Sequence, residues 1–307
     1  MISPTVLAIV GPTASGKTEV AFALSKKLPS EMISCDSMQV YKGMPLVTQA
    51  PSPKVHLASF LSPAREYSAA RFREDAFLLI RRILKAKKNP LLVGGTGLYL
   101  RALFDGLFEA EKGKREKDES LREELFSEHE RCGGNYLHEK LKEVDPASAA
   151  RIHPHDLRRL VRALEVFRLT GKPFSSQKAN RRGIREELPH RIFLILPDRA
   201  ELYARINRRV ERMFEEGLVE EVKGLMRRKL SRTAQMALGV REVKAYVEGQ
   251  LSLEEAKKLL KQNTRHYAKR QLSWFRHEQG VEEIPVLPDE SPGQVAEKIR
   301  RSLRHER

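Results

Sequence analysis

The stretch GPTASGKT at residues 11–18 decides the fold class, because it fits the phosphate-loop pattern G-x-x-x-x-G-K-[ST]. It follows an apolar run, TVLAIV at 5–10, and it leads into KTEVAFALSKKL at 17–28, where apolar residues recur at helical spacing. A buried strand, a glycine-rich turn and a helix in this order are typical of a parallel α/β domain. The sequence therefore predicts an anion-binding cradle at the carboxyl end of the first strand.

Each cradle residue has an expected role toward a phosphate. Gly11 and Gly16 let the backbone turn so that successive N–H groups point at phosphate oxygens. Lys17 supplies a positive charge, and the Thr18 hydroxyl is suited to hold Mg²⁺. We expect Lys17 to be exposed within the cradle. The predicted anion-binding residues are Gly11, Pro12, Thr13, Ala14, Ser15, Gly16, Lys17 and Thr18.

Three further apolar segments predict strands beside the first. They are EMISCDS at 31–37, PLLVGG at 90–95 and RIFLILP at 191–197. Helices are expected over 65–88 and, after Asp198 as a cap, over 198–229. Apolar strands that alternate with helices predict a parallel sheet covered on both faces, as in the P-loop NTPase-like α/β class.

The pattern changes between residues 110 and 189, where helical stretches are broken by turn sequences and no strand pattern occurs. We predict an all-helical insertion over 110–189. It would separate a first part of the α/β core, 1–109, from a second part, 190–307, whose C-terminal region is mostly helical.

Positive charge dominates the chain, with 57 Lys and Arg against 41 acids and a net charge of +16. Such a field favours a polyanionic partner. One cluster, residues 151–185, has ten basic residues and two acids. A second, KQNTRHYAKRQLSWFR at 261–276, has five basic residues, no acid and interleaved aromatics. Either cluster alone is more simply a solvated helix face, but the two together favour a folded RNA.

The cysteines and the hydropathy of the chain indicate where in the cell the protein is expected. Cys35 and Cys132 are far apart, so neither a metal site nor a disulfide framework is expected. No apolar stretch approaches the roughly 20 residues that span a bilayer. The first apolar run ends in the phosphate loop, so we interpret it as a buried strand and not as a signal peptide. We expect a cytoplasmic protein without a membrane partner.

Two turns beside the cradle can carry chemistry. Asp36 follows a predicted strand, where a carboxylate can orient metal-bound water or accept a proton from a nucleophile. An Asp–Ser pair after a strand is equally typical of a turn or helix cap. In GGTGLY at 94–99, Thr96 can donate to an anion, although a strand-to-helix turn explains these glycines more simply.

Together these pieces resemble one family, the tRNA dimethylallyltransferases or isopentenyltransferases. The similar stretches run in the family's order over nearly the whole chain. They are GPTASGKT, DSMQVYKGM, YSAARF, PLLVGGTGLYLRAL, IHPHDLRRLVRALEVFRLTGKP, RINRRVERMFEEGLVEEV and RHYAKRQLSWFR. The phosphate loop is generic, whereas D-S-x-Q-x-Y and AKRQ…WFR are far more specific.

The resemblance implies a reaction. The cradle would bind the pyrophosphate of dimethylallyl diphosphate, and the prenyl group would pass to the exocyclic amine of the adenosine 3′ to the anticodon. By similarity Asp36 accepts the proton of that amine. Arg209 would clamp the pyrophosphate, with Arg205 and Arg208 as alternatives. The implied catalytic residues are Asp36, Lys17, Thr18 and Arg209, with Mg²⁺ at Thr18.

The resemblance also implies a tRNA surface on a protein expected to be a monomer. The helical insertion would hold the anticodon stem-loop, and the flipped-out adenosine would lie against Ser37, Met38 and Gln39. The implied tRNA-binding residues are Asp36, Ser37, Met38, Gln39, Thr96, Arg158, Arg159, Leu160, Val161, Arg162, Arg265, Lys269 and Arg270. The chain departs from the family after Met44, where the segment is shorter and lacks the usual Asp, and at Val240, where Tyr is usual.

Three other functions fit part of the pattern. A prenyltransferase for free adenine nucleotides would share the chemistry without needing a basic insertion. A P-loop small-molecule kinase would bind ATP in the cradle and use Asp36 as its base. A non-catalytic RNA-binding protein would not need the intact Gly16, Lys17 and Thr18.

Overall fold

The computed structural model describes residues 4–51, 55–107, 118–176 and 183–304. Contacts divide the chain into two compact units, which we call unit 1 (Met1–Phe104 and Ile184–Arg307) and unit 2 (Asp105–Gly183). Both boundaries of unit 2 precede the predicted ones at 110 and 189. Residues from Ile184 onward belong to unit 1 because the Ile184 and Arg185 amides donate to the carbonyls of Leu103 and Phe104.

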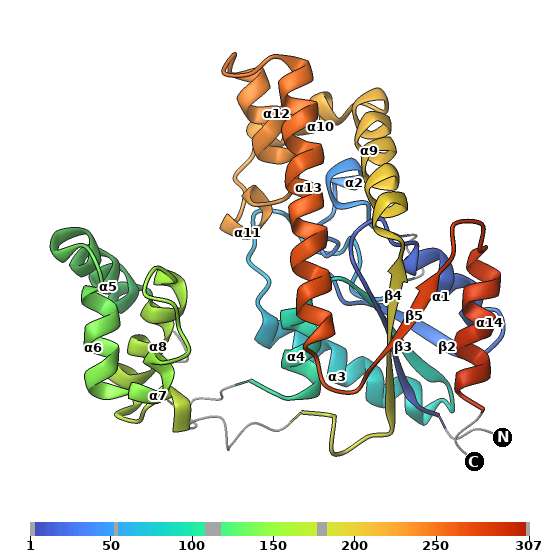
Figure 1. Ribbon diagram of the computed structural model, residues 1–307, viewed down its shortest axis with the longest axis horizontal. Helices are drawn as coiled ribbons and strands as arrows, with labels where there is room; N and C mark the ends of the chain where they lie inside the picture. Colours follow the sequence, from blue (N-terminus) through green and yellow to red (C-terminus); the bar gives the residue numbers. More distant parts are fainter. Residues whose placement is uncertain (1–3, 52–54, 108–117, 177–182, 305–307) are drawn as a thin grey trace. The chain divides into compact units, whose positions relative to one another are not determined.

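A five-stranded, all-parallel sheet forms the centre of unit 1, in the order β2-β3-β1-β4-β5 (Figure 1). The strands are β1 (Val6–Val10), β2 (Ser30–Ser34), β3 (Asn89–Gly94), β4 (His190–Pro197) and β5 (Val281–Val286). β1 is central and wholly buried, with Ala8 opposite Leu92 on one side and Ile192 on the other. The predicted α/β class is therefore confirmed, with the phosphate loop at the carboxyl end of β1.

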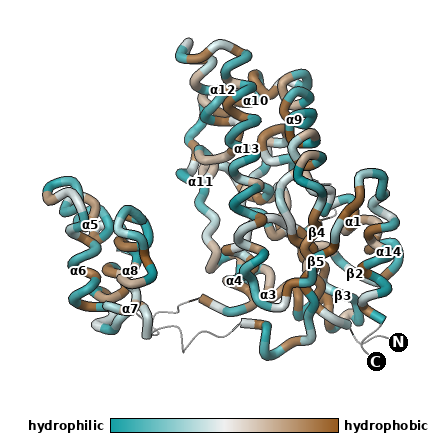
Figure 2. The backbone as a smooth tube through the Cα atoms, in the orientation of Figure 1, coloured by the Kyte–Doolittle hydropathy of each residue, from teal (hydrophilic) through white to brown (hydrophobic). Residues whose placement is uncertain are grey.

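The pleat of β1 sends alternate residues into two separate hydrophobic cores. Leu7 and Ile9 pack in the core that includes α1 (Lys17–Ser25) and α14 (Pro292–Ser302). Val6, Ala8 and Val10 belong to the opposite core, which includes α3 (Ala69–Lys85) and α4 (Gly97–Phe104). Figure 2 shows the hydrophobic strands between these helical layers. Helices thus cover both faces, as apolar parallel strands require.

A group of helices continues unit 1 beyond the carboxyl edge of the sheet (Figure 1). It comprises α2 (Pro45–Thr48), α9 (Arg199–Glu215), α10 (Leu218–Met226), α11 (Arg232–Gln235), α12 (Val240–Val247) and α13 (Leu253–Arg276). α13 packs against both α9 and α12, and α10 packs against α12. These helices form the walls above the phosphate loop.

Three expectations about elements were wrong. The long helix predicted over 198–229 is two helices, because the chain turns at Gly217 with φ 100°, a conformation that favours glycine. α3 begins only at Ala69, where the Ser68 hydroxyl accepts from the Arg71 amide and caps the helix. β5 was missed, since its half-exposed edge position permits Glu282, Glu283 and Pro285 in a strand.

Unit 2 is all-helical in its described part, as predicted. Its helices are α5 (Glu119–Cys132), α6 (Tyr136–Val144), α7 (Pro146–Ala149) and α8 (Leu157–Thr170). They enclose a core of their own that includes Leu125, Leu141 and Leu164. Of the predicted basic cluster, Lys178, Arg181 and Arg182 lie outside the described residues.

Candidate active site

The cradle borders a cavity of about 510 Å³ in unit 1. Its lining includes Thr13 to Thr18 from the phosphate loop and α1, Asp36 to Gln39 after β2, Val47 to Pro51 at α2, and Thr264, Tyr267 and Arg270 on α13, and α9 and the segment 236–238 complete it. Gly16 has φ 84°, so this turn favours glycine. The structure therefore brings six of the eight predicted anion-binding residues, Thr13 to Thr18, into one cavity with the Asp36 turn, whereas Gly11 and Pro12 are not part of its lining.

Lys17 is buried at the base of the cradle, so the expectation that it is exposed was wrong. Its side chain is 9% exposed, and Nζ donates to the carbonyl of Pro12 at 3.1 Å. Burial lowers the pKa of Lys17 to about 8, although the negative charge of Asp36 opposes this shift. An anion in the cradle would complete the charge balance of a buried ammonium.

Asp36 has one carboxylate oxygen engaged in its own turn. Oδ1 accepts from the Met38 amide at 2.9 Å, so the turn interpretation of this residue is confirmed. No described residue donates to Oδ2. Since Asp36 also lines the cavity and its charge acts on Lys17, the second oxygen is available to a ligand. The structural role and a chemical role are therefore compatible.

The glycine turn after β3 supports the Asp36 turn directly. A Cβ atom on Gly94 would lie 2.0 Å from the carbonyl oxygen of Cys35, so only glycine fits there. The Thr96 hydroxyl accepts from the Ser37 amide at 2.9 Å and donates to the Ser37 hydroxyl at 3.3 Å. Thr96 thus positions the wall that carries Asp36, and these glycines form the strand-to-helix turn that was the simpler interpretation.

Arg209 is the arginine of α9 that reaches the cradle. Its Nη1 donates to the Thr13 hydroxyl at 3.0 Å, and burial lowers the pKa of its guanidinium. Arg205 and Arg208 both pair with Glu201, and the Arg208 side chain is 67% exposed. Of the three arginines considered, Arg209 therefore has the geometry of a clamp on the bound anion.

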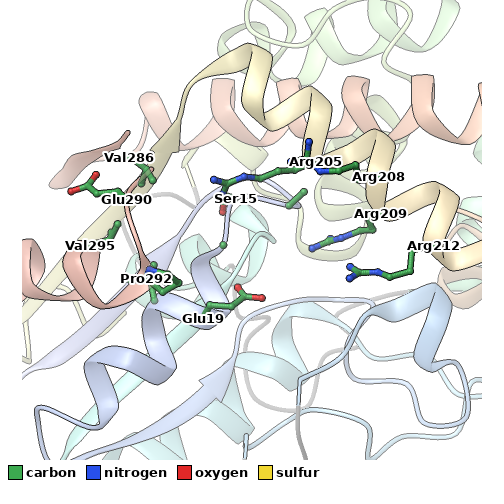
Figure 3. A pocket seen from close by; sticks show the side chains of 13 residues that line it. Ser15, Glu19, Arg205, Arg208, Arg209, Arg212, Val286, Glu290, Pro292 and Val295 are labelled. Atoms are coloured by element: carbon green, nitrogen blue, oxygen red, sulfur yellow. The ribbon is translucent and has the colours of Figure 1, made fainter. Parts of the chain in front are cut away.

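A second cavity, of about 490 Å³, adjoins the other side of the cradle. Figure 3 shows Arg205, Arg208, Arg209 and Arg212 along α9, with Glu19, Glu290, Pro292 and Val295 across from them. Ala14, Ser15, Gly16, Glu19, Arg209 and Arg212 line both cavities. The cradle is therefore accessible from two sides, and the arginine-rich side suits the approach of an anion.

Two residues of α13 belong to the site although the sequence assigned neither a role. Gln271 Oε1 accepts from the Thr13 amide at 2.8 Å, and its Nε2 donates to the Gly95 carbonyl at 2.9 Å, which ties the two glycine turns together. Tyr267 lines the cavity, where burial and the charge of Asp36 raise the pKa of its phenol. Their spacing of four residues places them on one face of a helix, and both belong to the RHYAKRQ part of the stretch RHYAKRQLSWFR.

The wall after Met44, where the chain departs from the family pattern, is held by Glu221 of α10. Its carboxylate accepts from the amides of Leu46 and Val47 at 3.0 and 2.9 Å. Gln39 Nε2 donates to the Gln49 carbonyl at 3.3 Å from the other side. The sequence offered no signal for this contact, because the two segments are about 175 residues apart.

The same cavity has an apolar portion. Val47, Val210, Met213, Met236, Ala237, Leu238 and Leu260 line it. Apolar side chains on one wall and phosphate-binding groups on another suit an amphiphilic ligand with a short hydrocarbon part and an anionic head.

The predicted tRNA-binding residues of α8 divide into two groups. Arg158 and Arg159 are exposed, and Arg159 pairs with Asp156. Leu160 and Val161 are 1% and 2% exposed and pack in the core of unit 2, which argues against RNA contacts through their side chains. Arg162 Nη1 donates to the buried Glu165 at 2.7 Å, so it stabilises the helix packing.

The basic residues of α13 also divide into those that contact other parts of the protein and those that are exposed. Arg265 Nη1 donates to Asn207 of α9 at 2.9 Å. Lys269 and Arg270 are exposed, and the Arg270 guanidinium lies 5.8 Å from the centre of the Tyr267 ring at the cavity wall. Val240, which replaces the usual Tyr, is buried.

The described lining of the cavity has too few ligating side chains to hold a metal ion by itself, but its oxygen groups fit a magnesium ion that is also bound by substrate phosphates. Among the described residues, no three His, Cys, Asp or Glu side chains are grouped to hold a metal ion. The Thr18 hydroxyl and Asp36 carboxylate line one cavity. Mg²⁺ is typically bound by one or two such oxygens together with substrate phosphates and water.

Comparisons with known proteins agree with this geometry. The sequence model of the IPP transferase family matches residues 39–278, and that of the isopentenyl transferases matches residues 4–71. A tRNA dimethylallyltransferase of Geobacter sulfurreducens is 44% identical over 91% of each chain, and one of Geobacillus thermodenitrificans is 43% identical over 97% of this chain and 96% of its own.

Solved structures give the same result. The tRNA isopentenylpyrophosphate transferase of Bacillus halodurans has a TM-score of 0.68 at 37% identity, over 98% of this chain and 97% of that one. A eukaryotic dimethylallyltransferase acting on tRNA has a TM-score of 0.83 at 26% identity, over 99% and 80%. Within the described residues, no helix is long and apolar enough to cross a membrane.

Proposed function

The chain belongs to the IPP transferase family, and on this premise we propose that it prenylates tRNA. It transfers a dimethylallyl group from dimethylallyl diphosphate to the exocyclic amine of the adenosine 3′ to the anticodon, and pyrophosphate leaves. The observation that carries the proposal is one cavity that joins a phosphate cradle, an apolar wall and the Asp36 carboxylate. The comparisons do not favour a P-loop kinase or an enzyme for free nucleotides.

Stabilisation of the leaving group is the first task of the site. As the bond between the allylic carbon and the diphosphate oxygen breaks, its electron pair moves onto the pyrophosphate. The cradle amides, Lys17 and Arg209 surround that position with positive charge. Donors that are already in place and screened from water stabilise developing charge most strongly, because they need no rearrangement during the reaction.

Activation of the amine is the second task. An adenine amine is a weak nucleophile, and it becomes competent when a base accepts its proton as the new carbon–nitrogen bond forms. We assign this role to Asp36, whose Oδ1 is fixed by the Met38 amide while Oδ2 faces no described donor. Ser37, Met38 and Gln39 form the adjacent cavity wall, against which a flipped-out adenine would lie.

The two cavities suggest separate routes for the substrates. The donor would approach through the arginine-rich cavity, and the adenosine would enter past Asp36 and Tyr267. Thr18, with Asp36 nearby, would hold Mg²⁺ together with the diphosphate oxygens, and the ion would neutralise part of the pyrophosphate charge. We further propose that the protein acts as a monomer in the cytoplasm, where its tRNA substrate is found.

The test is mass spectrometry of an anticodon stem-loop incubated with the protein, Mg²⁺ and dimethylallyl diphosphate. We expect one added prenyl group on the adenosine 3′ to the anticodon. A stem-loop with that adenosine moved should stay unmodified, since a flipped base must reach Asp36. Equal prenylation of free AMP or ADP would contradict the proposal.

A further inference from the structure

A third basic segment lies in unit 1, outside the two considered above. From Val222 to Arg241 the chain has six Lys or Arg residues and no acid. Four of them are exposed and close in sequence, Arg227, Arg228, Lys229 and Arg232, and we call them the 227–232 cluster. They lie between the end of α10 and the start of α11, which Figure 1 shows below α12.

The 227–232 cluster is anchored to residues of the segment between β2 and α3, which also carries the Asp36 turn. The Ser231 amide donates to the Pro63 carbonyl at 2.7 Å, and its buried hydroxyl lies 3.1 Å from the Tyr41 hydroxyl. The Thr233 amide donates to Glu66 at 3.2 Å. Side chains on so well anchored a segment present their charges at defined positions.

The cluster is also close to the cavity that would receive the adenosine. The segment that follows it contributes Met236, Ala237 and Leu238 to the cavity lining. Arg228 Nη1 lies 3.7 Å from the position of a Cβ atom on Gly43, in the turn after the DSMQVY stretch. Arg228 therefore lies beside the segment that continues from Asp36 to Gln39, and the cluster adjoins, along the chain, residues that line the cavity.

The 227–232 cluster differs from several other basic residues of unit 1 in its lack of counter-charges. Among the described residues, no acid forms an ion pair with any member of the cluster, and the nearby Glu66 accepts from Thr233 instead. By contrast, Lys257 and Lys261 share Glu211, and Arg82 and Lys88 share Glu31. Like charges held together without counter-charges favour binding of a polyanion.

We propose that the 227–232 cluster is a further RNA-binding surface, which contacts the backbone phosphates beside the target adenosine. The inference rests on the proposed function, because RNA is the polyanion that this cavity face would meet. Backbone contacts of this kind position the RNA without reading its sequence. They would hold the loop while its adenosine occupies the cavity.

The test measures binding of an anticodon stem-loop as a function of salt, without donor, so that no transfer occurs. The variant R227A/R228A/K229A is compared with R81A/K85A/K87A at the end of α3, which removes the same charge. That control site precedes β3 and lies at the amino edge of the parallel sheet, opposite the cradle. All six side chains are exposed.

We expect the slope of log affinity against log salt to fall by about 0.7 for each phosphate of single-stranded RNA that the variant no longer neutralises, or about two units for three phosphates. Affinity near 0.15 M salt should fall about fourfold for each of these phosphates. The control should keep the wild-type slope, and R227K/R228K should retain it because the charges remain.

Equal slopes for the two triple variants would overturn the proposal. It would also be overturned if R227A/R228A/K229A kept its stem-loop slope but no longer bound phosphatidylserine vesicles, since the surface would then serve a membrane. Wild-type protein that binds the stem-loop without prenylating it would contradict the proposed function and leave the assignment of this surface intact.

Discussion

The cradle and the basic surfaces use positive charge in opposite ways. In the cradle, Lys17 and Arg209 are largely buried, hydrogen-bonded to the phosphate loop and shifted to a lower pKa. On α8 and in the 227–232 cluster, Arg158 and Arg228 are exposed. A few desolvated charges at fixed positions suit the stabilisation of a leaving group, whereas many solvated charges suit an RNA backbone.

Among substitutions in the cradle and on the basic surfaces, removal of Lys17 should have the largest effect. Lys17→Ala takes away a preorganised donor to the pyrophosphate, and such substitutions typically lower kcat by about 10²–10³-fold. Single-turnover transfer at saturating donor measures this change, and stem-loop affinity should remain near the wild-type value. Because Lys17 is buried, a thermal melt must accompany the assay. Unchanged turnover would remove the cradle from the chemistry.

The pH dependence of donor capture should follow the lowered pKa of Lys17. The ammonium is charged below pH about 8 and loses its charge above it, so kcat/KM for the donor should fall by up to about tenfold per pH unit there. Bound diphosphate favours the charged form of Lys17, so kcat should depend less on pH than kcat/KM does. Lys17→Arg stays charged and should abolish this fall, even if it lowers the rate.

Loss of Glu221 should have a moderate effect that acts through α2. Glu221→Ala removes both acceptors of the Leu46 and Val47 amides, so we expect a several-fold rise in KM for donor or stem-loop with less change in kcat. Glu221→Gln keeps one acceptor and should recover part of the loss. Glu220→Ala, on the exposed side of the same helix, is the matched control. Equal effects at both positions would show that α2 needs no such support.

Substitution of the two exposed arginines at the start of α8 should have the smallest effect, confined to RNA binding. Arg158→Ala with Arg159→Ala should reduce the salt slope for stem-loop binding by about one to two units and leave donor affinity unchanged. Arg162→Ala should instead lower thermal stability, since it removes a partner of buried Glu165. If Arg162→Ala changes the slope more than the double variant does, the division between surface and core on this helix is wrong.

The sequence predicts the cradle and the Asp36 turn well because both are local. GPTASGKT specifies its own backbone, and apolar strands define a buried parallel sheet. Long-range contacts were not predictable. The hydrogen bonds of Gln271 with Thr13 and of Glu221 with α2 join distant segments, and Lys17 lies in a cavity that α9 and α13 also line.

Edges and breaks of elements were also hard to predict. β5 lies at the sheet edge, where charged residues in a strand remain solvated. One glycine, Gly217, divides α9 from α10 although the apolar pattern continues across it. The basic clusters indicated RNA binding, but the sequence did not separate Arg158, which is exposed, from Arg162, which pairs with a buried acid.

The central claim is that cradle and carboxylate divide the work, with Lys17 serving the donor and Asp36 the amine. The most direct test compares Asp36→Asn with wild type in single-turnover transfer, with donor and stem-loop affinities measured in parallel. We expect both affinities to stay close to wild type while the rate falls by about 10²–10⁴-fold, the usual contribution of a general base. A fall of less than about tenfold would contradict the account and leave Asp36 as a residue that only shapes its turn.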